Sequence, residues 1–261
     1  MSARRGIILD ELGLTPVWRL RAAAATTPLP AGASSAEAVG AATSRAAAVA
    51  FEPVVAAAVP GMDRGARIAL LGWTDLRLAV AGCDACDLHK SRNQTVFGVG
   101  DEKADWMLIG EAPGAEEDAR GEPFVGQAGQ LLEGMIGAIG LSRERNIYIT
   151  NVLKCRPPGN RNPAPQEVAQ CRPHLLRQVR LVQPRLILAM GRFAVQTLLR
   201  TEASIASLRG RLHSYEGVPL IVTYHPAYLL RTLADKSKAW EDLCLARQTM
   251  QDLLSAATPP H

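Results

Sequence analysis

Four short apolar runs in the C-terminal two thirds of the chain have the composition of buried strands. They occupy residues 105–110, 146–152, 185–190 and 218–224. The segments between and after them carry apolar residues at helical spacing, over residues 131–139, 165–182, 193–199 and 236–254. Strands that alternate with helices predict a parallel sheet with helices on both faces. In such an α/β fold the chemistry lies at the carboxyl ends of the strands.

The first 64 residues lack this alternation. Residues 21–64 are dominated by Ala, with Ser, Thr, Pro and Gly, which predicts a low-complexity linker that is disordered or, at 36–50 especially, loosely helical. Residues 1–20 form a short amphipathic segment with Ile8, Leu12 and Trp18 among its apolar positions. This segment either docks on a protein partner or on its own domain, or is a terminal extension with no specific role. The predicted organisation is therefore 1–20, 21–64 and a globular domain over 65–261.

The composition fits a globular enzyme and says little about its partner. The chain has 261 residues and 48% hydrophobic content, which is ample for one domain and an appendage. Its 29 Lys and Arg against 25 Asp and Glu give a formal charge of +4, which suits a polyanion but is also common among ordinary enzymes. Neither a signal-peptide core nor a bilayer-spanning run is present. We expect a cytoplasmic protein without membrane contact, associated with the nucleoid if it is bacterial.

Polar and aromatic side chains follow the predicted strands at the edge where the strands' carboxyl ends meet. Glu117 and Phe124 come after the first strand, Asn151 lies at the end of the second, and His225 follows the fourth. Each alone has a more common structural interpretation, as a loop charge, a core ring, a turn residue or a strand-end histidine. Together on one edge they favour a binding or catalytic site.

This set of residues meets the requirements for excising a base from a nucleic acid. A base taken out of the stack needs an aromatic face, an amide that reads its edge, and a donor near the carbonyl oxygen that gains charge as the glycosidic bond breaks. Phe124, Asn151 and His225 can supply these groups. The Asn side chain suits uracil because its carbonyl accepts from the ring N–H while its NH2 donates to the exocyclic oxygen. Cytosine has the opposite pattern and would leave both groups unpaired, at about 1–3 kcal/mol each.

The motifs at these strand ends resemble those of the family 4 uracil-DNA glycosylases. The resemblance covers roughly residues 76–254 and is specific, because several long motifs occur in the right order. The motifs are GEAPG at 110–114 with Glu117 and Asp118, GEPFVGQAG at 121–129, TNVLKCRPP at 150–158 and HPAYLLR at 225–231.

The resemblance implies a uracil-DNA glycosylase-like fold with a central four-stranded parallel sheet flanked by helices. It implies a base excision repair enzyme that flips uracil out of single- or double-stranded DNA, hydrolyses the N-glycosidic bond and leaves an abasic site, and we expect it to act as a monomer. Phe124 would stack on the uracil, Asn151 would read its edge, and His225 would stabilise the departing anion. The other implied substrate-binding residues are Gly110, Ala112 and Gly114 in the first loop, Glu117, which would exclude the methyl group of thymine, and Arg231, which would hold phosphate.

The residue that positions the attacking water is less clearly marked. In the better-known family 1 enzymes an aspartate orients this water, and Ala112 occupies that place here. Glu111 is the nearest carboxylate, so we predict that it positions the water or supports the reaction electrostatically. A dissociative reaction can also be driven largely by stabilising the leaving anion, so a dedicated base can be dispensable.

Four cysteines have the pattern of an all-cysteine metal site, with Cys83 and Cys86 as a close pair and Cys155 and Cys171 as distant single residues. In a reducing compartment such a pair indicates metal or redox chemistry rather than a disulfide. Spacing alone does not separate an iron-sulfur cluster from zinc, because both accept four thiolates. The family resemblance implies a structural 4Fe-4S cluster. Cys244 has no partner in this pattern and is predicted to lie in the core.

Two rival functions remain open from the sequence. The first is a non-catalytic iron-sulfur or zinc DNA-binding protein of the same fold, which would be free to lose Phe124, Asn151 and His225. The second is a related glycosylase that traps its product covalently or prefers other deaminated bases, although the basic insertion of such relatives is not seen here. Basic residues near the motifs form either a DNA-facing patch or scattered solvated charges. They are Lys90, Arg92, Lys154, Arg156, Arg161 and Arg172.

Overall fold

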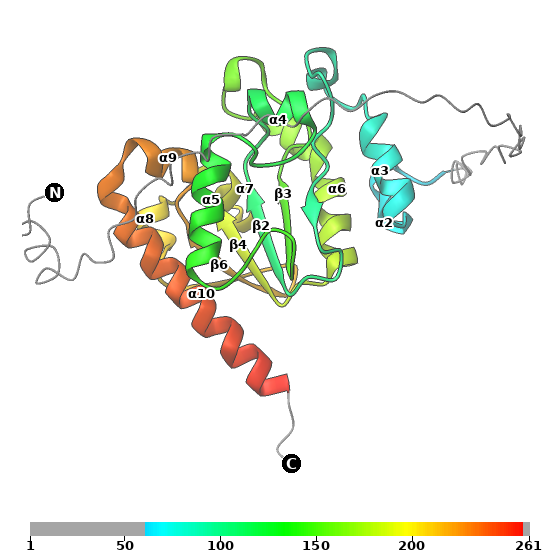
Figure 1. Ribbon diagram of the computed structural model, residues 1–261. Coiled ribbons are helices and arrows are strands. Elements are labelled where there is room, and N and C mark those ends of the chain that lie inside the picture. The colour runs from blue at the N-terminus through cyan, green and yellow to red at the C-terminus, as the bar shows by residue number, and fades with distance from the viewer. Residues whose placement is uncertain (1–60, 258–261) are drawn as a thin grey trace, which may run out of the picture. The chain divides into compact units, whose positions relative to one another are not determined.

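A six-stranded sheet covered by helices on both faces forms the centre of the molecule (Figure 1). The structure is a computed structural model, and it describes residues 61–257. The predicted amphipathic segment at 1–20 and nearly all of the predicted linker at 21–64 lie outside the described residues, as do residues 258–261.

The central four strands are parallel, as predicted. They are β2 (Trp106–Gly110), β3 (Ile147–Asn151), β4 (Leu186–Met190) and β6 (Val218–Thr223), in the order β3-β2-β4-β6. All residues of β2, β3 and β4 are buried, which explains why β2 and β4 are continuous apolar runs without alternation. Two antiparallel edge strands complete the sheet and were not predicted: β1 (Val99–Gly100) beside β3, and β5 (Leu212–Tyr215) beside β6.

The four helices predicted from apolar spacing are present; the bounds predicted for 165–182 are those observed, and the ends of the other three differ by at most four residues. They are α5 (Gln127–Ala138), α6 (Pro165–Val182), α7 (Arg192–Leu199) and α10 (Lys236–Ala257). Short helices that the apolar pattern did not predict are α2 (Arg64–Leu70), α3 (Trp73–Ala81), α4 (Ala115–Arg120), α8 (Ile205–Leu208) and α9 (Pro226–Arg231). Three 3₁₀ turns are η1 (Asp87–Lys90), η2 (Pro158–Asn160) and η3 (Leu233–Asp235). Of these elements, α4 and α9 matter most for function because each begins in a motif loop.

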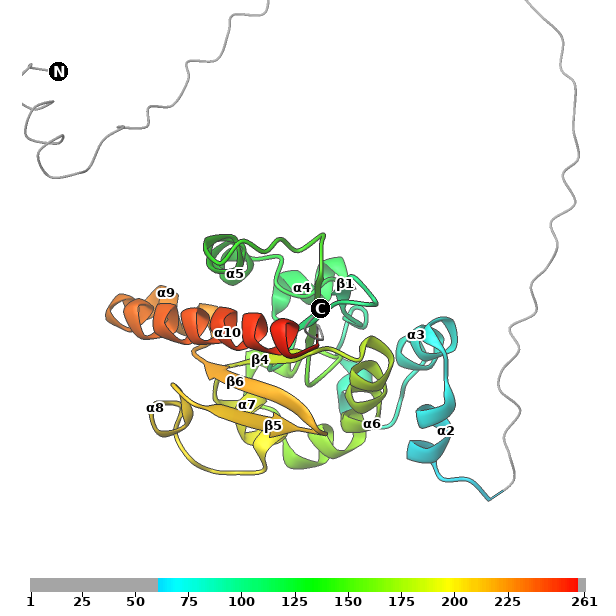
Figure 2. The same ribbon diagram turned by 90° about the horizontal axis from the view of Figure 1, so that it is seen from below.

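Two hydrophobic clusters fill the spaces above and below the sheet. One cluster joins the sheet to α6, α7 and α8, and the other joins it to α5, α9 and α10. Figure 2 shows these layers, with α2 and α3 next to α6. No helix within residues 61–257 combines the length and apolar character needed to cross a membrane.

Local sequence explains where α6 begins. Pro165 occupies its first turn, where a missing N–H costs nothing. The carboxylate of Glu167 accepts a hydrogen bond of 2.8 Å from the backbone N–H of Ala164 and also pairs with Arg161. This arrangement fixes the start of α6, and Cys171 lies in its second turn.

Candidate active site

The loops after β2, β3 and β6 bring the predicted site residues together. Gly110 and Asn151 are register partners at the ends of β2 and β3. A Cβ atom added to Gly110 would lie 2.4 Å from Asn151 Oδ1 and 2.6 Å from Phe124 Cζ. The aromatic ring and the amide therefore meet directly over the Gly110 backbone, and only glycine leaves room for both.

The amide oxygen of Asn151 is an unused buried acceptor. Asn151 is 2% exposed, and within the described chain its Oδ1 has no hydrogen-bond partner. Its backbone carbonyl is held by the buried ammonium of Lys154, at 2.7 Å. Leaving a buried acceptor unpaired costs about 1–3 kcal/mol, so this atom is suited to a ligand that brings a donor.

Phe124 is held in a strained conformation. Its φ of 56° lies in the left-handed region, which costs a non-glycine residue about 1–3 kcal/mol. Arg143 stabilises this loop by donating hydrogen bonds of 2.8 Å and 2.7 Å to the carbonyls of Pro123 and Phe124. The Phe124 ring stacks on the His225 ring, with 5.4 Å between centroids and 28° between planes.

Glu117 connects the first loop to the Phe124 loop. One carboxylate oxygen accepts from the backbone N–H of Gly114 at 3.0 Å, and the other accepts from Val125 at 3.0 Å and Gly126 at 3.3 Å. Both oxygens are thus engaged by backbone donors. This geometry gives Glu117 a positioning role for the loop that carries Phe124, whereas exclusion of a methyl group remains a prediction.

His225 is a neutral imidazole whose tautomer is fixed by the fold. It caps the N-terminus of α9, and its Nδ1 accepts a hydrogen bond of 3.1 Å from the backbone N–H of Ala227. Burial lowers the pKa of His225 to about 4, Glu117 opposes this shift, and Arg231 adds to it. Near neutral pH the proton therefore sits on Nε2, which makes that nitrogen a donor.

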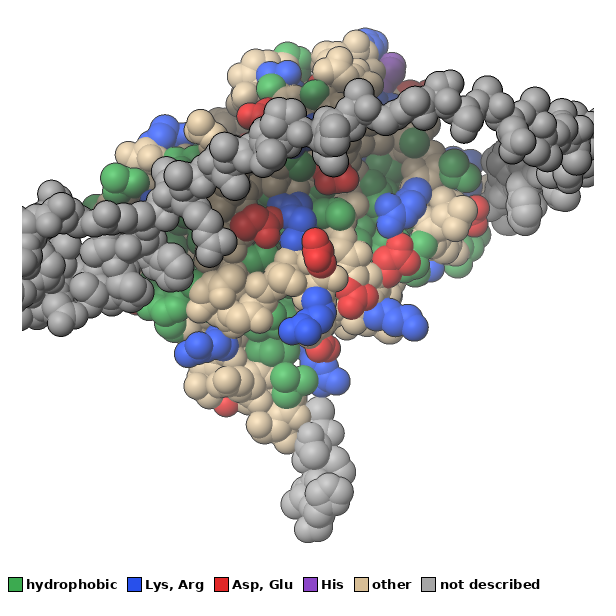
Figure 3. Space-filling view, in the orientation of Figure 1, with side chains coloured by type: hydrophobic (Ala, Val, Ile, Leu, Met, Phe, Trp, Pro, Cys, Tyr) green, Lys and Arg blue, Asp and Glu red, His purple; other side chains and the backbone are tan. Residues whose placement is uncertain are grey.

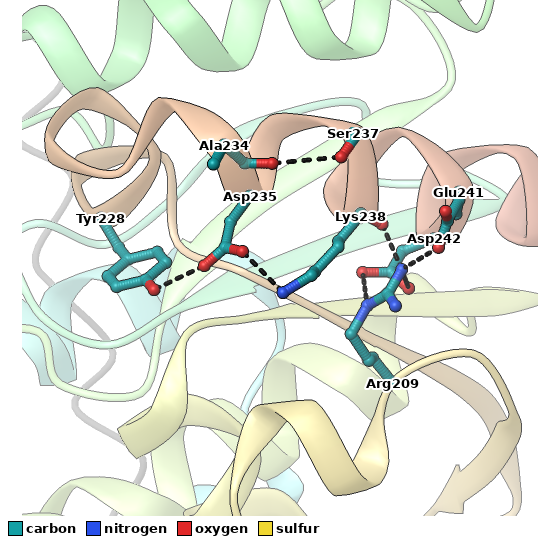
Figure 4. A network of polar contacts seen from close by, with 8 residues as sticks. All are labelled: Arg209, Tyr228, Ala234, Asp235, Ser237, Lys238, Glu241 and Asp242. Carbon is teal, nitrogen blue, oxygen red and sulfur yellow. Dashed lines mark hydrogen bonds and ion pairs between the residues drawn. The ribbon is translucent and has the colours of Figure 1, made fainter.

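A glycine and an ion-pair network fix the backbone around His225. Gly191 has a φ of +90°, and a Cβ there would lie 2.8 Å from the Cβ of His225. Figure 4 shows the polar contacts that join α9 to the 3₁₀ turn at Leu233–Asp235, this turn to α10, and Arg209 to α10. The Tyr228 hydroxyl donates to Asp235 at 2.6 Å, and Lys238 pairs with the same carboxylate at 2.8 Å. Arg209 adds ion pairs to Glu241 and Asp242, at 2.8 Å and 3.0 Å.

The carboxyl group of Glu111 has a raised pKa. Burial raises the pKa of Glu111 to about 7, and the positive charge of Arg192 at the start of α7 opposes this shift. Arg192 follows directly after the third predicted strand, which places it on the same rim, but no role in the site was predicted for it.

The remaining predicted residues lie around this centre. Gly114 is the N-cap of α4, and Ala112 packs beside Leu88, Leu153 and Cys155. Arg231 is exposed in the last turn of α9, near enough to influence the pKa of His225.

The four predicted cysteines line a single small cavity. Arg64 donates to the sulfur of Cys83 at 3.2 Å, and Arg92 donates to that of Cys155, also at 3.2 Å. Among residues 61–257, however, no group of three or more His, Cys, Asp or Glu side chains is arranged to hold a metal ion. The structure therefore brings the four thiols to one cavity, but the described residues do not form a ready metal site there.

The predicted basic patch is largely engaged in local contacts. Lys154 is fully buried, and Arg92 is bound to sulfur and to backbone carbonyls. Lys90, Arg161 and Arg172 pair with Asp87, Glu167 and Glu216, and Arg156 donates to Asn160. In the described part of the face that Figure 3 shows, basic and acidic side chains are also interspersed. The structure is thus closer to scattered charges than to a continuous DNA-facing patch.

Comparisons with known proteins identify relatives of the chain. A family model described as the uracil DNA glycosylase superfamily matches residues 97–244. The chain is 46% identical to the type-4 uracil-DNA glycosylase of Archaeoglobus fulgidus, over 60% of this chain and 82% of that protein. It is 41% identical to the type-4 enzyme of Pyrobaculum aerophilum, over 64% of this chain and 88% of that protein. Identity to the type-5 enzyme of the same organism is 33%, over 50% of this chain and 64% of that protein.

Proposed function

This chain belongs to the uracil DNA glycosylase superfamily and, within it, to the type-4 uracil-DNA glycosylases, and we propose that it removes uracil from DNA. The reaction is hydrolysis of the N-glycosidic bond, which leaves an abasic site for base excision repair. One observation carries the proposal for this chain's own residues: the buried, unpaired Oδ1 of Asn151 lies beside the Phe124 ring over a glycine that admits no side chain.

Recognition follows from the hydrogen-bonding pattern of the base. The flipped uracil stacks on Phe124, its N3–H donates to Asn151 Oδ1, and its O4 accepts from Asn151 Nδ2. Cytosine offers an acceptor at N3 and a donor at N4, so both contacts are lost and the Oδ1 stays unpaired.

Bond cleavage relies on a neutral donor near the leaving group. As the glycosidic bond lengthens, negative charge collects on the uracil O2. The Nε2–H of His225 donates to that oxygen without giving up its proton, because the low pKa of the imidazole keeps it neutral. Glu111 orients the water that attacks C1′ of the sugar, and Arg231 holds a backbone phosphate.

The ionisation of Glu111 gives this role a pH signature. With a pKa of about 7, the carboxylate is lost as the pH falls, so we expect the single-turnover excision rate to rise between about pH 6 and pH 8 and then level off. Glu111→Gln should be slower and lack this rise, because its side chain does not titrate. Glu116→Gln, in which an exposed carboxylate of α4 is removed, is the matched control and should keep it. The same rise in Glu111→Gln as in wild type would exclude Glu111 as its source.

We propose a 4Fe-4S cluster as a structural cofactor of the four cysteines. The four thiols line one cavity, and an all-cysteine set of four is the usual ligand set of such a cluster. Arginine donors at two sulfurs also suit an anionic cluster. When bound, the group supplies cross-links between η1, the loop after β3, and α6. The chain's own chemistry, through Asn151 and His225, needs no electron transfer.

Loss of one ligand should therefore destabilise the protein. We expect Cys171→Ser to lower the melting temperature by about 5–10 °C, which corresponds to a few kcal/mol in a domain of this size, and to reduce bound iron. Cys244→Ser makes the same chemical change in α10, and it should lower the melting temperature and the iron content less than Cys171→Ser does. Thermal unfolding and iron analysis measure both. Unchanged stability with full excision activity in Cys171→Ser would rule out the structural role.

A strand-cleavage assay tests the proposed activity. An oligonucleotide with one deoxyuridine, single-stranded or in a duplex, is incubated with the protein and treated with alkali, which breaks the strand at an abasic site. We expect a break at uracil and none in matched oligonucleotides with cytosine or thymine. Binding without a break would favour the non-catalytic DNA-binding alternative.

A further inference from the structure

We propose that Arg64 and Arg92 form a cationic, hydrogen-bonding shell around the four-thiol site and raise the reduction potential of its cluster. This inference rests on the iron-sulfur cofactor proposed above. Both arginines precede residue 97, where the family match begins, so the match does not cover them. They come from separate parts of the chain, α2 and the segment after η1, and act on different sulfurs.

Arg92 is fixed by three contacts on one side of the thiol cavity. Its Nη1 donates to Cys155 Sγ at 3.2 Å and to the Cys83 carbonyl at 2.7 Å, and its Nη2 donates to the Ala81 carbonyl at 3.0 Å. The two backbone contacts orient the guanidinium, so its donation to sulfur requires no rearrangement. Arg92 therefore links the loop that carries Cys83 to the sulfur of Cys155.

Arg64 occupies the corresponding position beside Cys83. Its Nη2 lies 3.2 Å from Cys83 Sγ and 2.8 Å from His174 Nε2, and its Nη1 donates to the Gln170 carbonyl at 2.7 Å. Because a guanidinium has no acceptor, the His174 Nε2 must accept, which leaves the ring proton on Nδ1. His174 is buried, so this contact fixes Arg64 from the side of α6.

A third thiol receives a backbone donor. The N–H of Lys154 points to Cys171 Sγ at 3.3 Å. Cys83, Cys155 and Cys171 thus each accept an N–H bond, and two of these donors carry a full positive charge. N–H donors of this kind suit sulfurs that carry the negative charge of cluster-bound thiolates.

The electrostatic consequence has a definite sign. Adding an electron to a four-thiolate cluster makes it more negative, and nearby cations and N–H donors stabilise the more negative state more strongly. Hydrogen bonds to sulfur and net charge are established determinants of cluster potentials. Removing either guanidinium should therefore make reduction harder and shift the potential to more negative values.

The test compares Arg64→Gln and Arg92→Gln with Arg67→Gln in the full-length, cluster-containing protein. Arg67 lies in the same helix as Arg64 and is exposed, so its replacement controls for the loss of one surface charge. The potential is measured by redox titration of the visible absorption band, with iron content and uracil excision measured on the same samples. We expect Arg64→Gln to lower the equilibrium constant for one-electron reduction about tenfold, or about 59 mV, and Arg67→Gln to leave it near the wild-type value.

Each outcome decides a different part of the proposal. If the reduction potential of Arg64→Gln equals that of Arg67→Gln, the role of Arg64 is overturned. In the same way, a reduction potential of Arg92→Gln equal to that of Arg67→Gln overturns the role of Arg92. If Arg92→Gln loses iron because its backbone contacts are gone, Arg92→Lys, which keeps a positive charge, provides the second comparison. Its reduction potential should lie below that of the wild type, but by less than the removal of the charge would cause. A wild-type protein without iron overturns the cluster and this inference, whereas one with the cluster but without uracil excision overturns only the proposed activity.

Discussion

Replacing Asn151 with alanine is expected to slow single-turnover uracil excision by about 10²- to 10³-fold, the usual cost of removing one preorganised polar contact in an active site. The substitution removes the acceptor for N3–H and the donor for O4 together. The fold should tolerate it, because the Asn151 Oδ1 makes no hydrogen bond within the described chain and the contact from Lys154 is to the backbone carbonyl. Thermal unfolding of the variant should therefore stay close to that of the wild type.

Asn162→Ala is the matched control for this experiment. Asn162 is exposed in the segment before α6, and the hydrogen bond that it accepts from Arg161 is made by its backbone carbonyl. The control should excise uracil at the wild-type rate. If Asn151→Ala also kept more than about a tenth of that rate, edge recognition by this amide could not be the basis of catalysis and specificity.

The second large effect is expected at His225. His225→Ala removes the Nε2–H donor to the departing uracil and should reduce the single-turnover rate by about 10²- to 10³-fold, with a smaller effect on DNA affinity, because the charge on O2 develops only in the transition state. The imidazole stays neutral above a pKa of about 4, so its loss should not change the shape of the pH profile above pH 5. Excision rates and DNA binding from pH 5 to 9 measure both effects.

His213→Ala controls for the loss of an imidazole elsewhere in the chain. His213 lies in β5, at the edge of the sheet, and its Nε2 is 2.7 Å from the Leu208 carbonyl oxygen. This variant should retain excision even if its stability falls. Equal losses of rate and of DNA affinity in His225→Ala would indicate a binding role and contradict stabilisation of the leaving anion.

The elements that position the site could be predicted where burial dominates. Fully buried strands such as β2 and β4 are continuous apolar runs, and α6 combines an apolar stripe with a proline start. The edge strands left no such signal. β1 has two residues, and three of the four residues in β5 are exposed or only partly buried. Their pairing is decided by neighbouring strands rather than by their own sequence.

The site was predictable as a set of residues but not as a set of contacts. The alternation of strands and helices, which predicts a parallel sheet, placed Asn151 and His225 at one edge. The contacts of Arg143 with the Phe124 loop, and of Arg64 and Arg92 with sulfur, join positions far apart in the chain. Basic residues of this kind look like solvated or DNA-binding charges in a sequence. Their partners become visible only when the loops are packed.

Release of free uracil tests the central claim most directly. Duplex DNA that carries one uracil per strand is incubated with the wild-type protein, and the released base and the abasic sites are counted by mass spectrometry. We expect one free uracil for each abasic site and no free cytosine or thymine from the same strand, with release reduced about 10²- to 10³-fold in Asn151→Ala. Intact DNA after incubation with the folded, cluster-containing wild-type protein would contradict uracil excision as the function of this chain.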